Sequence, residues 1–239
     1  MSNWGALATG RLLTDFSLWS ADLLRLEEEI RRVDPFADLY HIDVSDGHAA
    51  RAFLFFPDLV ARVRSATQKL LHVHLEVDSS ILLEQIDQFA GAGADVISIG
   101  STWSGGLTGA ALDRIRRCGK VAGLAIGYGT VPETAEPYLE LIQILTLMGT
   151  ATGVKGQQLI PNALARLERA RVILRKRGMN HRVRIAADGA IRRETVPSLR
   201  ASGADIVIMG SLAFGSENLA ATIQWLHSLP SPSWSMESG

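Results

Sequence analysis

The segment HIDVSDGH (residues 41–48) carries two histidines and two aspartates in what otherwise reads as a buried strand. Polar residues alternate there with apolar ones. Because successive side chains of a strand point to opposite faces, His41, Asp43 and Ser45 share one face. A buried imidazole or carboxylate is costly unless it is paired or binds a metal. This face is therefore a candidate functional site.

Two further segments carry groups of the same kind. In LLHVHLEV (residues 70–77) His72, His74 and Glu76 share one face, and Asp188 follows in the later segment AADG. Two imidazoles and two carboxylates form a reasonable ligand set for a divalent transition metal. The alternative is that these residues lie at the rim of the fold, bonded to backbone and water. We favour a shared site because three separate segments contribute to it.

Three glycine-containing loops predict a phosphate site. They are TGVKGQQ (residues 152–158), ADGA (187–190) and MGS (209–211). Glycines let backbone N–H groups approach an anion closely, and helix N-termini add a partial positive charge. Lys155 could add a further charge or could simply be a solvated lysine.

A metal, a phosphate site and two carboxylates together indicate chemistry on a sugar phosphate. A metal that chelates the carbonyl and the neighbouring hydroxyl oxygen would stabilise the enediolate formed when the carbon loses its proton. Two carboxylates on opposite faces could then remove a proton from one side and return one on the other. This chemistry inverts the carbon, so the predicted enzyme is an epimerase.

These groups must be positioned by an α/β fold. Eight short apolar segments read as strands, at residues 12–19, 39–46, 70–77, 95–101, 121–127, 142–149, 183–189 and 205–211. Amphipathic helical spacing recurs between or after them, at residues 20–33, 56–66, 81–93, 110–119, 162–178 and 218–229. Residues 131–141 are a less certain helix, because Pro137 interrupts them.

Strand–helix alternation of this kind predicts a closed (β/α)8 TIM barrel, in which reactive groups lie at the carboxyl ends of the strands. A doubly wound open sheet is the alternative fold. The first strand is not followed by a G-x-G-x-x-G turn, so dinucleotide binding has no support.

The length of 239 residues suits one barrel domain, residues 1–239, with frayed tails at about 1–10 and 230–239. The formal net charge of −1 gives no indication of a nucleic-acid-binding surface. We expect no signal peptide, no membrane span and a cytoplasmic location. The single cysteine excludes an internal disulfide and fits a reducing compartment.

Several other residues have structural interpretations. Asp46 and His48 read as residues of a turn that supports the site rather than as catalytic groups. Cys118 reads as a packing residue at a helix end, and Trp103 could line the pocket or a subunit contact.

The order and spacing of these motifs resemble the ribulose-phosphate 3-epimerase family, including its allulose-6-phosphate 3-epimerase-like members. The resemblance covers nearly the whole chain, through ADLYHIDVSDGH, VHLEV, MGTATGVKGQQLIPNALARL, ADGAIRRETV and SGADIVIMGSLAF. The most specific element is H-x-D-x-x-D-G-H with a later V-H-L and D-G.

The resemblance implies a barrel of the ribulose-phosphate binding type and a ketose-phosphate 3-epimerase of the isomerase class that uses one divalent metal ion: zinc, iron, manganese or cobalt. The implied metal ligands are His41, Asp43, His74 and Asp188, and Asp43 and Asp188 would be the acid/base pair. Substrate and phosphate would contact Ser17, His74, Met148, Gly153, Val154, Lys155, Gly156, Gly189, Ala190, Gly210 and Ser211. The family also implies a homo-oligomer.

The pocket wall departs from the family pattern. Ser45 and Glu76 stand where the family usually has methionine. This difference predicts a more polar pocket. Glu76 would lie either beside the metal or toward the solvent. The substrate could then be a ketose phosphate other than ribulose 5-phosphate. Two alternatives stay open: a metal-dependent sugar-phosphate lyase or decarboxylase on the same barrel, and a non-catalytic sugar-phosphate binding protein.

Overall fold

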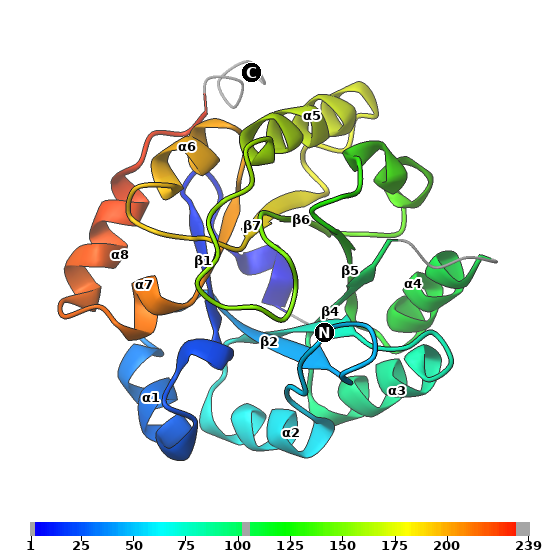
Figure 1. Cartoon of the computed structure of the whole chain (residues 1–239), viewed down its shortest axis with the longest axis horizontal. Coiled ribbons are helices and arrows are strands. Elements are labelled where there is room, and N and C mark those ends of the chain that lie inside the picture. The colour runs from blue at the N-terminus through cyan, green and yellow to red at the C-terminus, as the bar shows by residue number, and fades with distance from the viewer. Residues whose placement is uncertain (1–2, 102–105, 233–239) are drawn as a thin grey trace.

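Eight parallel strands close into a barrel in the computed structural model, which describes residues 3–101 and 106–232. Each strand pairs with its neighbours in the sequence, and β1 pairs with β8. Figure 1 looks down this barrel, with the helices forming an outer ring. The predicted TIM barrel is confirmed, and the open sheet is excluded. The strands are β1 (Leu13–Ser17), β2 (Leu39–Ser45), β3 (Leu70–Glu76), β4 (Val96–Gly100), β5 (Val121–Ile126), β6 (Ile144–Met148), β7 (Arg184–Asp188) and β8 (Ile206–Met209).

Alternation along the strands builds the barrel interior in layers. The floor is an apolar cluster to which each strand contributes near its first residues, including Leu13, Leu39 and Leu70. Residues two positions further along a strand face the same interior. The layer above Leu39 therefore contains His41, and the layer above that contains Asp43. The opposite strand faces pack on the helices in a larger apolar core.

The helices follow the predicted spacing, with some differences at their ends. They are α1 (Leu26–Val33), α2 (Pro57–Ala66), α3 (Leu82–Ala92), α4 (Leu107–Arg117), α5 (Ala163–Lys176), α6 (Val196–Ala201), α7 (Ser211–Phe214) and α8 (Leu219–Ser228). The segment predicted as an uncertain helix contains the 3-10 helix Pro132–Tyr138. Pro137 lies inside it and offers no amide hydrogen for a regular α-helical ladder. Helices α6 and α7 were not predicted, because they are too short to show a periodic pattern.

The chain ends lie partly within the described residues. Residues 3–10, which we expected to fray, include the 3-10 helix Asn3–Ala6. Trp4, Leu7 and Ala8 pack against the apolar floor cluster. The single domain with frayed ends stays a prediction, and Trp103 lies outside the described residues. Among the residues that are described, no helix is long and apolar enough to cross a membrane.

Candidate active site

Strands β2, β3 and β7 bring the four predicted metal ligands together at the carboxyl end of the barrel. His41, Asp43, His74 and Asp188 each offer one ligand atom, and these atoms all lie within 4.8 Å of one another. Nε2 of His41 lies 3.3 Å from Oδ1 of Asp43 and 4.0 Å from Oδ2 of Asp188. The structure thus joins residues that are up to 147 positions apart in the sequence.

The two imidazoles have nitrogen atoms suited to a metal. Nε2 of His41 and Nε2 of His74 are buried and have no hydrogen-bond partner among the described residues. Both side chains are almost fully buried. A buried nitrogen without a partner is costly, and a divalent metal held jointly with the neighbouring carboxylates would satisfy it. The residues therefore fit a divalent metal ion with histidine and carboxylate ligands.

The two aspartates have different electrostatic environments. Burial raises the pKa of Asp43, but the nearby His41 imidazole outweighs it and brings this pKa to about 2. Burial also raises the pKa of Asp188; Asp43 adds to the rise, and the opposing effect of His41 is weaker, so the pKa reaches about 6. In the metal-free protein one carboxyl group is thus ionised at neutral pH, while the other binds a proton more readily.

Ser17 and Glu76 support this cluster from two sides. The Ser17 hydroxyl donates a hydrogen bond of 2.9 Å to Oδ2 of Asp43. Oε1 of Glu76 lies 3.2 Å from Nε2 of His74, so Glu76 stands beside a candidate ligand rather than pointing away from the barrel. Burial lowers the pKa of His74, but the Glu76 carboxylate outweighs it and the pKa is raised.

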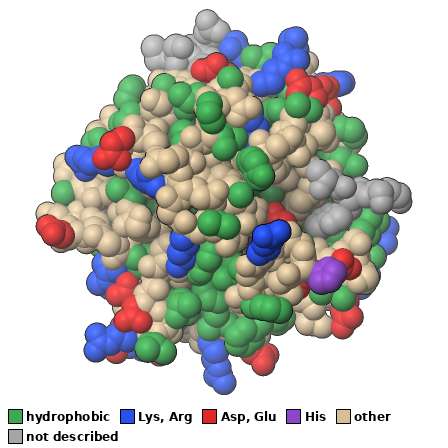
Figure 2. All heavy atoms as spheres, viewed as in Figure 1, with side chains coloured by type: hydrophobic (Ala, Val, Ile, Leu, Met, Phe, Trp, Pro, Cys, Tyr) green, Lys and Arg blue, Asp and Glu red, His purple; other side chains and the backbone are tan. Residues whose placement is uncertain are grey.

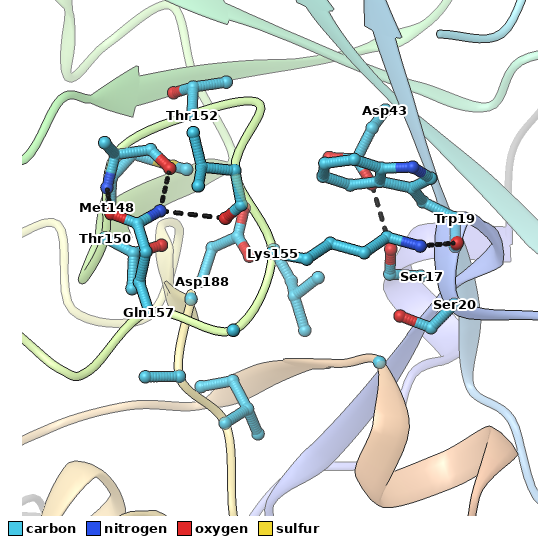
Figure 3. A pocket seen from close by; sticks show the side chains of 18 of the residues that line it. Ser17, Trp19, Ser20, Asp43, Met148, Thr150, Thr152, Lys155, Gln157 and Asp188 are labelled. Atoms are coloured by element: carbon cyan, nitrogen blue, oxygen red, sulfur yellow. Dashed lines mark hydrogen bonds between the residues drawn. The ribbon is translucent and has the colours of Figure 1, made fainter. Parts of the chain in front are cut away.

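A cavity of about 350 Å³ opens above the cluster, and Figure 3 shows the side chains around it. Asp43 and Asp188 line it together with ten of the predicted substrate and phosphate residues: Ser17, Met148, Gly153, Val154, Lys155, Gly156, Gly189, Ala190, Gly210 and Ser211. His41 and His74 lie deeper, buried beneath it. Residues that the sequence did not single out also line it: Trp19, Ser20, Thr150, Ala151, Thr152, Gln157, Ile191, Arg192 and Ile208.

The segment after β6 passes across the mouth of the barrel, as the yellow-green loop in Figure 1 shows. Nε2 of Gln157 donates to the carbonyls of Ala151 and Val154, and Arg192 donates to the carbonyls of Gly156 and Gln157. These bonds fix the loop from inside and from the segment after β7. The sequence marked this loop by its glycines but not the side chains that hold it.

Two cations accompany the loops. Nζ of Lys155 donates a 2.6 Å hydrogen bond to the Trp19 carbonyl and lies 4.7 Å from the centre of the indole ring, so Lys155 reaches across the mouth to β1's end. Arg192 lines the cavity on the other side. Figure 2 shows Lys and Arg side chains near the middle of this face, with most acidic side chains at its margins. Cations so placed favour an anionic ligand.

The segment after β7 has a strained backbone. Gly189 has φ of +94° and Ala190, which is not a glycine, has φ of +53°. A Cβ atom at position 189 would lie 2.2 Å from Oγ1 of Thr150. Strain of this kind is retained only where the surrounding structure enforces it. Both residues line the cavity.

A buried arginine was not singled out by the sequence. Arg166, on α5, donates to the carbonyls of Met148, Gly127 and two other residues at the ends of β5 and β6. In ALARLERAR its position reads like one of several exposed charges on a helix. Its contacts show instead that it holds together the ends of β5 and β6, and Met148 at the end of β6 lines the cavity.

The turn after β2 agrees with its structural interpretation. Asp46 accepts hydrogen bonds from the backbone N–H groups of His48, Ala49 and Asp78. His48 is exposed, and the Ser45 hydroxyl donates to the Ala50 carbonyl. Ser45 and Glu76 are not among the described residues that line the cavity, and Glu76 lies beside the candidate ligand His74, the first of its two expected positions.

Comparisons with known proteins identify the family of this chain. A family model described as the ribulose-phosphate 3 epimerase family matches residues 13–214. A ribulose-phosphate 3-epimerase of Chlamydia pneumoniae is 31% identical over 205 residues, which cover 85% of this chain and 88% of that protein. The enzyme of the same name from Synechocystis sp. is 31% identical over 209 residues, covering 87% and 89%, and that from Bacillus subtilis 30% over 203 residues, covering 84% and 92%.

Solved structures share the fold at lower identity. A 3-hexulose-6-phosphate synthase superposes with a TM-score of 0.65 and 17% identity, over 92% of this chain and all of that one. A 3-keto-L-gulonate-6-phosphate decarboxylase from Vibrio cholerae gives a TM-score of 0.68 and 15% identity, over 94% of this chain and all of that one. These two similarities concern the fold alone. From the family match and the sequence relatives, this chain belongs to the ribulose-phosphate 3-epimerase family and is an enzyme of the isomerase class.

Proposed function

We propose that this protein is a metal-dependent ketose-phosphate 3-epimerase that interconverts D-ribulose 5-phosphate and D-xylulose 5-phosphate or a related pair of ketose phosphates. One observation carries the proposal. Two aspartates from strands that are not neighbours in the barrel approach the same His41 nitrogen at the floor of the cavity.

His41, Asp43, His74 and Asp188 would hold one divalent ion, and zinc, iron, manganese and cobalt all suit this donor set. A bound divalent ion would act as a Lewis acid for the negative charge that develops on the substrate oxygens. The Nε2 atoms of both histidines are buried beside carboxylate oxygens without a hydrogen bond in the described residues, which supports this assignment.

The two aspartates would move the proton at C3. Asp43, ionised at neutral pH and fixed by the Ser17 hydroxyl, is ready to accept a proton from one face of the substrate carbon. Asp188, which lines the same cavity from β7, would exchange a proton on the other face. The roles exchange in the reverse reaction. The carbon is inverted because the proton leaves on one side and returns on the other.

The substrate phosphate would bind at the three loops predicted from the sequence. Backbone N–H groups around Gly153–Gly156, Gly189–Ala190 and Gly210–Ser211 border the cavity, and Lys155 and Arg192 supply positive charge. Met148 and the Trp19 ring provide apolar wall. Glu76 lies beside the candidate metal ligand His74 and not among the residues that line the cavity. The preference for one sugar would therefore depend on the metal site as much as on the residues that line the cavity.

Deuterium exchange tests the proposal. The protein, prepared with zinc, iron, manganese or cobalt in turn, would be incubated with D-ribulose 5-phosphate in deuterated water and the C3 proton followed by NMR. We expect loss of this proton together with signals of xylulose 5-phosphate, and no reaction after removal of the metal with a chelator.

Other products would redirect the assignment. Carbon dioxide or an aldehyde in place of an epimer would indicate the lyase or decarboxylase alternative. The alternative result is that the metal-loaded protein binds ketose phosphates and yet exchanges the C3 proton of none of the tetrulose, pentulose and hexulose phosphates. That result would overturn the epimerase proposal in favour of a binding protein. The homo-oligomeric state and the cytoplasmic location stay predictions.

A further inference from the structure

A second layer of polar side chains lies directly beneath the candidate metal ligands. Asp15, His72 and Ser98 are fully buried in the barrel, as is His41. Because alternate residues of a strand face the same side, Asp15 lies one layer below Ser17, and His72 lies one layer below His74. A carboxylate and two imidazoles without solvent access need a physical reason, since burial of each is costly.

These residues contact one another in a chain. Nδ1 of His72 lies 2.6 Å from Oδ2 of Asp15, and Nε2 of His72 lies 2.7 Å from Oγ of Ser98. Nδ1 of His41 lies 3.4 Å from the same Asp15 oxygen and 3.3 Å from Nδ1 of His72. The second oxygen of Asp15, Oδ1, is buried without a hydrogen-bond partner in the described part of the chain.

The positions of the protons follow from these contacts. One oxygen of Asp15 lies within hydrogen-bonding distance of two imidazole nitrogens, and an ionised carboxylate can only accept. His72 must then donate from Nδ1 to Asp15 and, when neutral, accept at Nε2 from the Ser98 hydroxyl. Its Nδ1 cannot also accept from His41. The remaining acceptor for the Nδ1–H group of His41 is Asp15.

We propose that Asp15 is a positioning residue for the metal site: it accepts the Nδ1–H group of His41 and so directs the Nε2 lone pair of His41 toward the metal position between Asp43 and Asp188. This inference rests on the proposed function, because it assigns a role in holding the ion. A carboxylate behind a metal-binding imidazole fixes the tautomer and ring orientation and strengthens the ligand. His72 holds Asp15 in place, and Ser98 holds His72.

The same three side chains could be read as a metal site of their own, since Asp15, His41 and His72 also offer ligand atoms within 4.8 Å of one another. The short contact between Asp15 and His72 argues for a hydrogen bond instead. At 2.6 Å it has the length of a charge-assisted hydrogen bond, whereas two ligands of one zinc ion at about 2.0–2.1 Å in a tetrahedral arrangement would lie farther apart. Metal stoichiometry separates the two readings.

Zinc affinity and histidine NMR test the role of Asp15. Wild type, Asp15→Asn and the control Thr146→Val would be titrated with zinc against a competing chelator, and the zinc-loaded proteins compared by long-range ¹H–¹⁵N spectra of their six histidines. Thr146 is a suitable control because its hydroxyl is also buried in the barrel without a described partner. The control keeps side-chain volume and leaves the imidazole contacts intact.

We expect one zinc per chain, bound to His41 through Nε2, with a downfield Nδ1 proton. Asp15→Asn should weaken zinc binding about 10- to 100-fold and move that proton upfield, while Thr146→Val changes neither. Unchanged affinity in Asp15→Asn, zinc on Nδ1 of His41, or two zinc ions per chain in wild type would each overturn the inference. If Asp15→Asn does not fold, the wild-type spectrum still decides, because Nδ1 must carry the proton.

Failure of the proposed function would be visible separately. It would appear in the wild type, as absent zinc binding or as metal-loaded protein that does not epimerise any ketose phosphate. Failure of the Asp15 role would appear only in the comparison of a metal-binding, active wild type with its variant.

Discussion

Asp43 and Asp188 reach the same nitrogen of His41 from strands β2 and β7, yet the pKa of Asp43 is about 2 and that of Asp188 about 6. Burial raises the pKa of both carboxyl groups, but His41 opposes it more strongly at Asp43, which lies 3.3 Å from the imidazole nitrogen against 4.0 Å for Asp188. Asp43 also accepts a hydrogen bond from Ser17. The negative charge of Asp43 then opposes ionisation of Asp188. Two carboxyl groups that reach one cavity from different strands are what two-sided proton transfer requires.

The first prediction concerns these two aspartates. Asp43→Asn and Asp188→Asn should each reduce epimerisation by about 10³-fold, because each removes the acid/base group of one face. Exchange with deuterated water should become one-sided: each variant should exchange the C3 proton of one epimer and not of the other. Exchange would be measured by NMR separately from ribulose 5-phosphate and from xylulose 5-phosphate.

Metal content must be matched in this comparison, since both aspartates are candidate ligands. Ser17→Ala is the control: it keeps both carboxyl groups, removes a cavity-lining hydroxyl that donates to Asp43, and should slow both directions to a smaller and similar degree. Loss of exchange from both epimers in both metal-loaded aspartate variants would contradict assignment of one carboxyl group to each face.

A second prediction concerns the strained turn after β7. Gly189→Ala should destabilise the protein by about 1–3 kcal/mol and weaken substrate binding, because φ is +94° and the new Cβ would lie 2.2 Å from Oγ1 of Thr150. Gly156→Ala is the matched control, with φ of +79° but no described atom within 4 Å of the added Cβ. It should carry the conformational strain without the clash.

Adding Thr150→Ala to Gly189→Ala should recover part of the loss, because it removes the closest atom. The wild type, the two single variants and the double variant form a double-mutant cycle. The free energy of unfolding in urea and the KM for substrate would be measured for all four. Strict additivity of the two substitutions would show that the contact with Thr150 is not what requires glycine.

The strands, and the clustering of the four predicted metal ligands, were predictable from the sequence for a physical reason. Strand alternation places His41 and Asp43 on one face whatever surrounds them, and strand ends in a closed barrel meet at one mouth. Glu76 was placed on the correct face, but its contact with His74 depends on a side-chain torsion that spacing does not determine. Asp15 lies in LLTDFSLW, where a single acidic residue gave no sign of two buried imidazole neighbours from other strands.

Arg166 shows a second limit of sequence reasoning. Within ALARLERAR nothing distinguishes it from Arg169, three residues later on the same helix, yet Arg166 is buried and Arg169 is exposed. Which arginine is buried depends on where the ends of β5 and β6 leave free carbonyls. That information is tertiary, so helical periodicity alone does not contain it.

The third prediction uses this pair. Arg166→Met should destabilise the protein by about 3 kcal/mol, because it leaves buried carbonyls at the ends of β5 and β6 without donors. Arg169→Met should change the free energy of unfolding by less than about 1 kcal/mol, since Arg169 forms an exposed ion pair with Glu133. Urea unfolding of both variants gives the comparison, and equal effects would contradict a special role for Arg166.

The last prediction concerns pH and the floor of the barrel. Arg11 donates two hydrogen bonds to Asp38, at 2.8 and 2.6 Å, and the backbone N–H of Thr14 donates a third. Burial raises the pKa of Asp38, but Arg11 outweighs it, so the folded-state pKa lies below 3.8. The folded protein therefore binds this proton less readily than the unfolded chain does. The stabilisation is fully present above pH 3.8 and is lost as pH falls through the lower folded-state value.

Asp38→Asn should consequently lower the free energy of unfolding by about 2 kcal/mol at pH 7, and its difference from wild type should shrink below pH 3.8. Glu27→Gln, which removes an exposed ion pair with Arg31, should cost less than about 0.5 kcal/mol at pH 7. Urea unfolding from pH 7 to pH 3 measures both. A difference between wild type and Asp38→Asn that stays constant over this range would mean that the carboxylate charge of Asp38 does not stabilise the fold, and that only its hydrogen-bonding shape matters.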